Sequence, residues 1–186
     1  MKRVRIAALA GVVVVGGVAC GGDDEEESTE PTASNTTAAP TTTTTADPRA
    51  EVEEAYLAYW DAYLKAVTEP VDPELPELQQ LITGAQRTIV GRNLQQLQAR
   101  GEAVRLRQPS LYRHVVRTIE RANRSASVEA CVYDDLITYD VATGVKVDDS
   151  VGWKNVHAEL VQQQGGWLVS YLEIGRATGG GSCAST

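Results

Sequence analysis

Apolar residues recur every three or four positions from residue 47 onward, which is the period of an amphipathic helix. Asp47 followed by Pro48 is a strong start signal, because aspartate caps the first turn and proline loses no hydrogen bond there. The pattern predicts a long helix that begins here, ends before Pro70 and buries one aromatic face. That face consists of Val52, Tyr56, Tyr59 or Trp60, Tyr63 and Val67.

Two further helices are predicted before the pattern changes. Asp72 and Pro73 repeat the start signal and predict a short helix through the apolar positions of 75–82. A third helix spans about 85–100, and Gly101 is its expected stop because glycine accepts the left-handed conformation that ends many helices. The inward-facing residues of the third helix are expected to be Ile89, Leu94 and Leu97.

After Gly101 the apolar period shortens to that of β-strands. Turn residues at 140–144 and 165–166 lie between strand-like segments, at distances typical of hairpins. Helices followed by hairpin-connected strands indicate an α+β domain with an antiparallel sheet. The expected strands are 102–107, 113–121, 127–133, 152–163 and 167–174.

The N-terminus has the layout of an export signal. Basic residues within 2–5 precede an uncharged apolar stretch at 6–19, which is too short to span a bilayer comfortably. The stretch ends in Ala19 and Cys20 and resembles the signal of bacterial lipoproteins, whose cysteine receives diacylglycerol before the signal is cleaved. The resemblance implies a signal peptide at 1–19 and palmitate-type lipidation of Cys20. The alternatives are an uncleaved anchor and an ordinary secretory signal.

A polar segment separates this signal from the predicted domain. From residue 21 to 46 there is no Leu, Ile, Val or aromatic residue, and six carboxylates face no opposite charge. Such a segment cannot offset its ordering entropy by burial, so 20–46 is predicted to be a lipidated cysteine followed by a disordered, acidic and Thr-rich tether. It is either a bare spacer or a carrier of O-linked sugars. All ten aromatic residues lie at or after Tyr56, which assigns the folded domain to 47–186.

The three cysteines favour a lipid and a disulfide. If Cys20 carries the lipid, Cys131 and Cys183 remain as a pair in an exported protein, where disulfides persist. Their disulfide would hold the C-terminus against a predicted strand. Two free thiols are the alternative.

Several short segments accompany the order of the predicted elements over 47–183. They are Leu81–Ala85, Ala130–Val132, Asp140–Gly144, Gly165–Val169 and Cys183. Together with that order, they resemble the nuclear transport factor 2-like superfamily, also called SnoaL-like, and most closely its exported actinobacterial lipoprotein members. The resemblance implies a cone-shaped fold with three N-terminal helices packed on a curved antiparallel sheet, and pairing through the sheet in many members. Functions vary widely among proteins of one such fold, so activity does not follow from it.

The net charge of −8 argues against a nucleic-acid partner. Basic residues nevertheless concentrate in 87–124, which holds nine Arg and two Glu. Arg113, Arg117 and Arg121 are separated by even numbers of residues and are therefore predicted to share one face of a strand. They form either an anion-binding face for wall polymers, lipid head groups or an acidic partner, or cross-strand pairs with acids.

Candidate chemistry is limited to the expected cone, where enzymes of the resembled superfamily use carboxylates, Tyr or His. An isomerase needs a general base and an oxyanion donor, and neither role matches a motif of that superfamily in this chain, so no catalytic residue is assigned. No metal or other cofactor is expected, because the two histidines lack metal-ligand spacing. The candidate pocket residues are Tyr56, Tyr59, Trp60, Tyr63 and His157, with Asp61 and His114 as further candidates, although the aromatic stripe also fits plain core. Asp134, Asp135, Asp140, Asp148 and Asp149 are interpreted as turn residues.

Three functional hypotheses follow. The preferred one is a lipid-anchored protein on the outer face of the bacterial cytoplasmic membrane that presents a non-enzymatic binding or assembly domain. Its partners would be the membrane through Cys20 and an envelope protein or anionic polymer, with a homodimer through the sheet left open. The second is an isomerase-like or dehydratase-like enzyme with its site in the cone, and the third is a carrier of a small hydrophobic ligand.

Overall fold

The computed structural model describes residues 47–176 and Cys183. In this part helices come first and antiparallel strands follow, so the predicted α+β class is confirmed. None of these helices is both long and apolar enough to cross a bilayer. The predicted signal, Cys20 and the tether lie outside the described residues. The elements are α1 (Pro48–Val67), α2 (Pro76–Gln79), α3 (Gly84–Arg100), β1 (Glu102–Leu106), β2 (Arg113–Ala122), β3 (Ser125–Asp134), β4 (Leu136–Asp140), β5 (Lys146–Asp148), β6 (Gly152–Gln163) and β7 (Gly166–Arg176).

Helix α1 begins and ends as its sequence predicts. The Asp47 side chain accepts a hydrogen bond from the backbone N–H of Arg49 at 2.9 Å, which satisfies one of the free donors of the first turn. At the other end the Thr68 hydroxyl donates to the Leu64 carbonyl at 2.7 Å, and Pro70 follows. The buried residues of α1 are Val52, Tyr56, Tyr59, Trp60, Ala62, Ala66 and Val67.

Helix α2 is shorter than predicted and starts later. Asp72 accepts from the backbone N–H of Glu74 at 2.9 Å and so caps a turn rather than a helix. The residue before a proline avoids the helical region, which keeps Leu75 out of the helix and lets α2 begin only at Pro76.

Helix α3 ends at Gly101, as predicted, and this glycine has a φ of +65°. Its buried face differs from the prediction at one position, because Val90 is 2% exposed whereas Ile89, the predicted inward residue, is only half-buried. Leu94 and Leu97 are buried as predicted.

The strands form two antiparallel sheets. The order is β2-β3-β6-β7 in the four-stranded sheet and β1-β4-β5 in the three-stranded one. Strands β4 and β5 are not among the predicted strands, because they flank the predicted turn at 140–144 and the three residues of β5 are all exposed. Asp135 lies between β3 and β4 and is fully buried. Its carboxylate accepts the backbone N–H of Gln108 and pairs with Arg107 at 3.3 Å, which anchors the chain where it leaves one sheet for the other.

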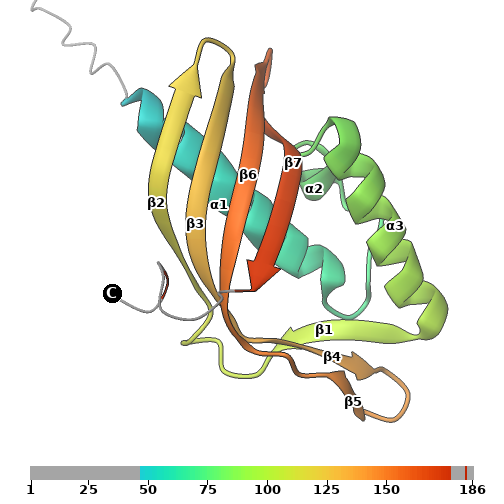
Figure 1. Cartoon of the computed structure of the whole chain (residues 1–186). Coiled ribbons are helices and arrows are strands. Elements are labelled where there is room, and N and C mark those ends of the chain that lie inside the picture. Colours follow the sequence, from blue (N-terminus) through green and yellow to red (C-terminus); the bar gives the residue numbers. More distant parts are fainter. Residues whose placement is uncertain (1–46, 177–182, 184–186) are drawn as a thin grey trace, which may run out of the picture. The chain divides into compact units, whose positions relative to one another are not determined.

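The core lies between α1 and the four-stranded sheet. Figure 1 shows α1 crossing one face of this sheet, with α3 beyond its β7 edge. We call the face that packs on α1 the inner face and the opposite one the outer face. Side chains alternate between the two faces along each strand. The inner face is defined on β3 by Ala126, Val128, Ala130 and Val132, and on β6 by their register partners Leu160, Ala158, Val156 and Lys154.

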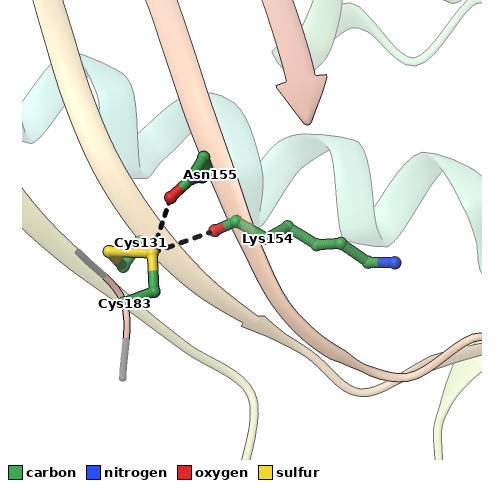
Figure 2. The surroundings of a disulfide bond; sticks show 4 residues. All are labelled: Cys131, Lys154, Asn155 and Cys183. Atoms are coloured by element: carbon green, nitrogen blue, oxygen red, sulfur yellow. Dashed lines mark hydrogen bonds between the residues drawn. A yellow bond between two sulfur atoms is a disulfide. The ribbon is translucent and has the colours of Figure 1, made fainter. Parts of the chain in front are cut away.

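The predicted disulfide between Cys131 and Cys183 is present. Its two Cα atoms are 5.4 Å apart, and both residues are 3% exposed. Figure 2 shows Cys183 beside β6, where its Sγ lies 2.8 Å from Asn155 Oδ1 and 3.6 Å from the Lys154 carbonyl oxygen. The bond therefore fixes Cys183, which follows the last strand, on the outer face of the four-stranded sheet.

Candidate functional site

The four candidate pocket residues of α1 meet one another as packed side chains. Tyr56, Tyr59 and Trp60 are 0%, 2% and 5% exposed, and Tyr63 is half-buried. The ring centroids of Tyr59 and Trp60 are 5.3 Å apart, and those of Tyr59 and Tyr63 are 6.0 Å apart and stacked. Contacts at these distances are those of an aromatic core cluster.

His157, the fifth candidate pocket residue, does not join this cluster. Its neighbours along β6, Val156 and Ala158, are buried on the inner face, so His157 points to the outer face. There its Nδ1 lies 2.5 Å from Glu129 Oε1, and its Nε2 lies 3.9 Å from Glu159 Oε1. The prediction that His157 lines the pocket is therefore corrected. No group of residues with metal-ligating geometry is found among the described residues, this cluster included.

His114 takes the place that the sequence analysis gives to His157. It lies on the inner face of β2 opposite Val132, and its ring centroid is 4.9 Å from that of Trp60. One ring nitrogen, Nδ1, is 3.2 Å from the Tyr56 hydroxyl, and the other, Nε2, is 3.0 Å from the Tyr112 hydroxyl. Tyr112 is the member of this network that the sequence analysis missed; its position two residues before His114 in a strand-like segment was the available signal.

Burial governs the protonation of this network. It lowers the pKa of His114 from 6.5 to about 4, so the ring is neutral near pH 7. A neutral imidazole accepts one hydrogen bond and donates one, and the two tyrosine hydroxyls meet both needs. Burial also raises the pKa of Tyr56 and of Tyr112, which keeps both hydroxyls protonated. His114 is thus a weak base whose two nitrogens are already engaged.

The neighbouring acids do not supply a better base. Asp61, the carboxylate proposed from α1, is exposed. Burial raises the pKa of Asp134, but its Oδ1 accepts the backbone N–H of Leu136 at 3.0 Å, as expected of a turn residue. Among the described residues, two polar atoms beside this cluster have no hydrogen-bond partner, Trp60 Nε1 and Gln86 Oε1, and a third, Trp167 Nε1, lies elsewhere in the core. The first two are the remaining polar groups that a molecule entering the cluster could address.

The three candidate arginines of β2 do not share a face. The register of β2 against β3 shifts between Val116 and Thr118, which makes Arg117 the extra residue of a β-bulge. Arg113 pairs with Tyr133 and Arg121 pairs with Ala126, and these partners are seven residues apart on a strand without a bulge. Arg113 therefore lies on the outer face and Arg121 on the inner face. The even spacing predicted otherwise because a bulge reverses the alternation.

Two of these arginines stack on tryptophans instead of pairing with acids. The Arg113 guanidinium carbon lies 5.1 Å from the centre of the Trp153 ring, and that of Arg121 lies 5.2 Å from the centre of Trp167. Between residues 47 and 176, none of the three forms a salt bridge. Arg117 lines a hollow together with Thr118, Glu129, Ala130 and Asn155, of which Thr118, Glu129 and Asn155 belong to the outer face.

Comparisons with known proteins identify a fold and no family. No protein-family model matches the chain, and no curated protein matches its sequence. The intermembrane space region of the chloroplast protein ARC6 is similar in structure, with a TM-score of 0.57 at 15% identity over 69% of this chain and 95% of that one. At this level of identity the similarity concerns the fold alone.

Other similar structures include proteins described as NTF2-like. A proposed dehydratase of the NTF2-like family from Streptomyces avermitilis has a TM-score of 0.45 at 11% identity, over 69% of this chain and 97% of that one. An NTF2-like protein with a cystatin-like fold from Novosphingobium aromaticivorans has a TM-score of 0.41 at 14% identity, over 73% and 85%.

Proposed function

We propose that this chain is a lipid-anchored protein on the outer face of the bacterial cytoplasmic membrane, where its domain binds or assembles with an envelope component and catalyses no reaction. The proposal of the anchor rests on the basic start, the short apolar stretch and the Ala19–Cys20 step. Two acyl chains on one cysteine give durable attachment, whereas one chain binds a membrane only marginally.

One observation carries the non-enzymatic part of the proposal. The side chains that would line a reaction site in the cone pack against one another, and both nitrogens of His114 are occupied by tyrosine hydroxyls. A general base must reach its substrate through a free nitrogen or oxygen. The outer face of the four-stranded sheet, by contrast, presents exposed charged residues, including Arg113, Glu129 and Glu159.

The anchor is tested by metabolic labelling with an alkyne analogue of palmitate. The wild-type chain and Cys183→Ser should be labelled and recovered with membranes, whereas Cys20→Ala should lose the label. Cys183→Ser is the matched control because it removes a cysteine outside the proposed signal. Equal labelling of wild type and Cys20→Ala would eliminate the proposed anchor.

The binding role is tested by photo-crosslinking in intact cells. A benzophenone amino acid at Thr118, on the outer face, should capture an envelope protein or polymer, or a second copy of this chain. The same group at Gln95, on the exposed side of α3, is the control and should capture little. Equal capture at both positions, or none at Thr118, would contradict a binding role for the outer face.

An enzyme of the isomerase or dehydratase class is the second candidate, and the Tyr56–His114–Tyr112 network favours it. Such enzymes move a proton next to a carbonyl group, so the test is deuterium uptake from D₂O by a panel of small ketones and hydroxyketones. Uptake by the wild type that is lost in His114→Gln and kept in Trp153→Phe would establish this function. No uptake with the wild type would count against it.

The third hypothesis, a carrier of a small hydrophobic ligand, is favoured by no described contact over the binding domain or the enzyme.

A further inference from the structure

Three residues form a row across the outer face of the four-stranded sheet, and we call them the Arg113 cluster. Arg113 on β2 is the register partner of Tyr133 on β3, which is in turn the partner of Trp153 on β6. The rings of Tyr133 and Trp153 meet edge to face with their centroids 5.5 Å apart. The Arg113 guanidinium lies over the Trp153 ring at 5.1 Å. The cluster therefore joins a cation to two aromatic rings on one surface.

The stacking prepares Arg113 to bind an anion. Its guanidinium uses its flat face on the indole, which leaves the N–H groups at its edge available as a fork for a carboxylate or phosphate. Arg113 is exposed, and no salt bridge engages it within residues 47–176. A guanidinium that is already held in place loses less side-chain entropy when an anion binds.

Arg117 supplies a second cation on the same face. The bulge makes it the extra residue of β2, and it lines the hollow with Thr118 and Glu129. The two arginines are four residues apart along an extended strand, which corresponds to about 13 Å. Two cations at this separation favour a ligand with repeated negative charges over a single small anion.

We infer that the Arg113 cluster and Arg117 bind an acidic polysaccharide, with its carboxylate groups on the arginines and its sugar rings beside Tyr133 and Trp153. This inference rests on the proposed function, because it names the envelope component. Tyr133 and Trp153 combine apolar ring area with a hydroxyl and an indole N–H, which suits sugars. Glu120, Glu129, Glu159 and Glu173 also occupy the outer face and together repel an anionic bilayer that covers it. A thin polymer along Arg113 and Arg117 meets fewer of these acids, of which only Glu129 lines the hollow with Arg117.

The test measures binding of the full-length chain, reconstituted in phosphatidylcholine vesicles, by titration calorimetry. The probes are polygalacturonate fragments, neutral dextran and phosphatidylglycerol vesicles. Wild type should bind polygalacturonate and neither of the others, and Arg113→Gln and Arg117→Gln should each weaken binding about tenfold. Arg121→Gln is the matched control, because Arg121 also stacks on a tryptophan but lies on the inner face, and it should change the affinity less than twofold.

Further variants separate recognition from folding. Arg113→Lys keeps the charge and loses the planar fork, so it should bind several-fold more weakly than wild type while unfolding at the same temperature. Absence of polygalacturonate binding, equal binding of dextran, preference for vesicles, or equal loss in Arg121→Gln would each overturn the inference. Labelling of the same preparations at Cys20 is scored separately, so that loss of the anchor and loss of glycan binding are distinguishable.

Discussion

At the scale of single residues, His114 is the group that couples the fold to pH. Its pKa is lowered to about 4 by burial, against 6.5 in the unfolded chain. Between these values the unfolded chain takes up a proton that the folded protein does not, so the free energy of unfolding falls as the pH falls. Replacing His114 with Gln should remove this dependence, which amounts to about 3 kcal/mol between pH 6.5 and 4.

The measurement is urea unfolding of wild type and His114→Gln at pH 7, 5.5 and 4. Burial raises the pKa of Asp134, which acts in the opposite direction. That contribution is present in both proteins and cancels in their difference. Below pH 4 the folded His114 is also protonated, so the difference should stop growing there. Parallel stability curves down to pH 4 would show that His114 is not the group responsible.

The contrast between the two histidines shows what can be predicted for single residues. His114 and His157 both stand in strand-like segments, and composition does not distinguish them. Their faces follow from alternation relative to buried neighbours, and Val156 and Ala158 already indicated an outward His157. The hydrogen bond of His114 to Tyr56 joins residues 58 positions apart, which local patterns do not encode.

At the scale of elements, Gly91 inside α3 and Gly101, which ends it, predict opposite effects of the same substitution. Gly101 has a φ of +65°, which costs other residues about 1 kcal/mol, so Gly101→Ala should destabilise the domain by that amount. Gly91 lies inside the helix, and an added Cβ meets no atom within 4 Å. Gly91→Ala should therefore stabilise it by up to about 1 kcal/mol.

Thermal unfolding of both glycine variants beside wild type checks this pair. The effects should have opposite signs, because one substitution strains the end of the helix and the other lowers the entropy of the unfolded chain. Two destabilising variants would mean that Gly91 is packed more closely than its surroundings indicate.

Elements with strong local signals could be predicted, and those set by long-range pairing could not. The cap at Asp47 and the stop at Gly101 are local, so α1 and the end of α3 follow from the sequence. The bulge at Arg117 depends on the register between β2 and β3, and no residue type in β2 predicts it. The short β5 has no buried face to produce an alternating pattern. The proposed polysaccharide site could therefore not be predicted from the sequence either, because the bulge determines which arginines share the outer face.

At the scale of the whole molecule, the disulfide is expected to contribute strongly to stability. It joins residues 52 positions apart, and closing such a loop in the unfolded chain is worth about 4 kcal/mol in the chain-entropy model. Cys183→Ser should lower the free energy of unfolding by about this amount. Urea unfolding with and without dithiothreitol provides the measurement and its control. Reduction should lower the free energy of unfolding of wild type to that of the variant and leave the variant's value unchanged. A variant as stable as oxidised wild type would contradict the prediction.

The predicted domain boundary at residue 47 has a consequence for truncated chains. Residues 21–46 contain no Leu, Ile, Val or aromatic side chain, so they have little apolar surface to bury. A chain of residues 44–186 should therefore unfold within about 0.5 kcal/mol of the longer chain that begins at Cys20. A chain of residues 49–186 lacks Asp47, whose side chain caps α1, and should lose about 1 kcal/mol more. Chemical denaturation of the three chains separates the effect of the cap from that of the tether. A lower free energy of unfolding already in 44–186 would assign residues before 44 to the folded domain. An unchanged free energy of unfolding in 49–186 would show that α1 is stabilised by its packing on the sheet and not by its cap.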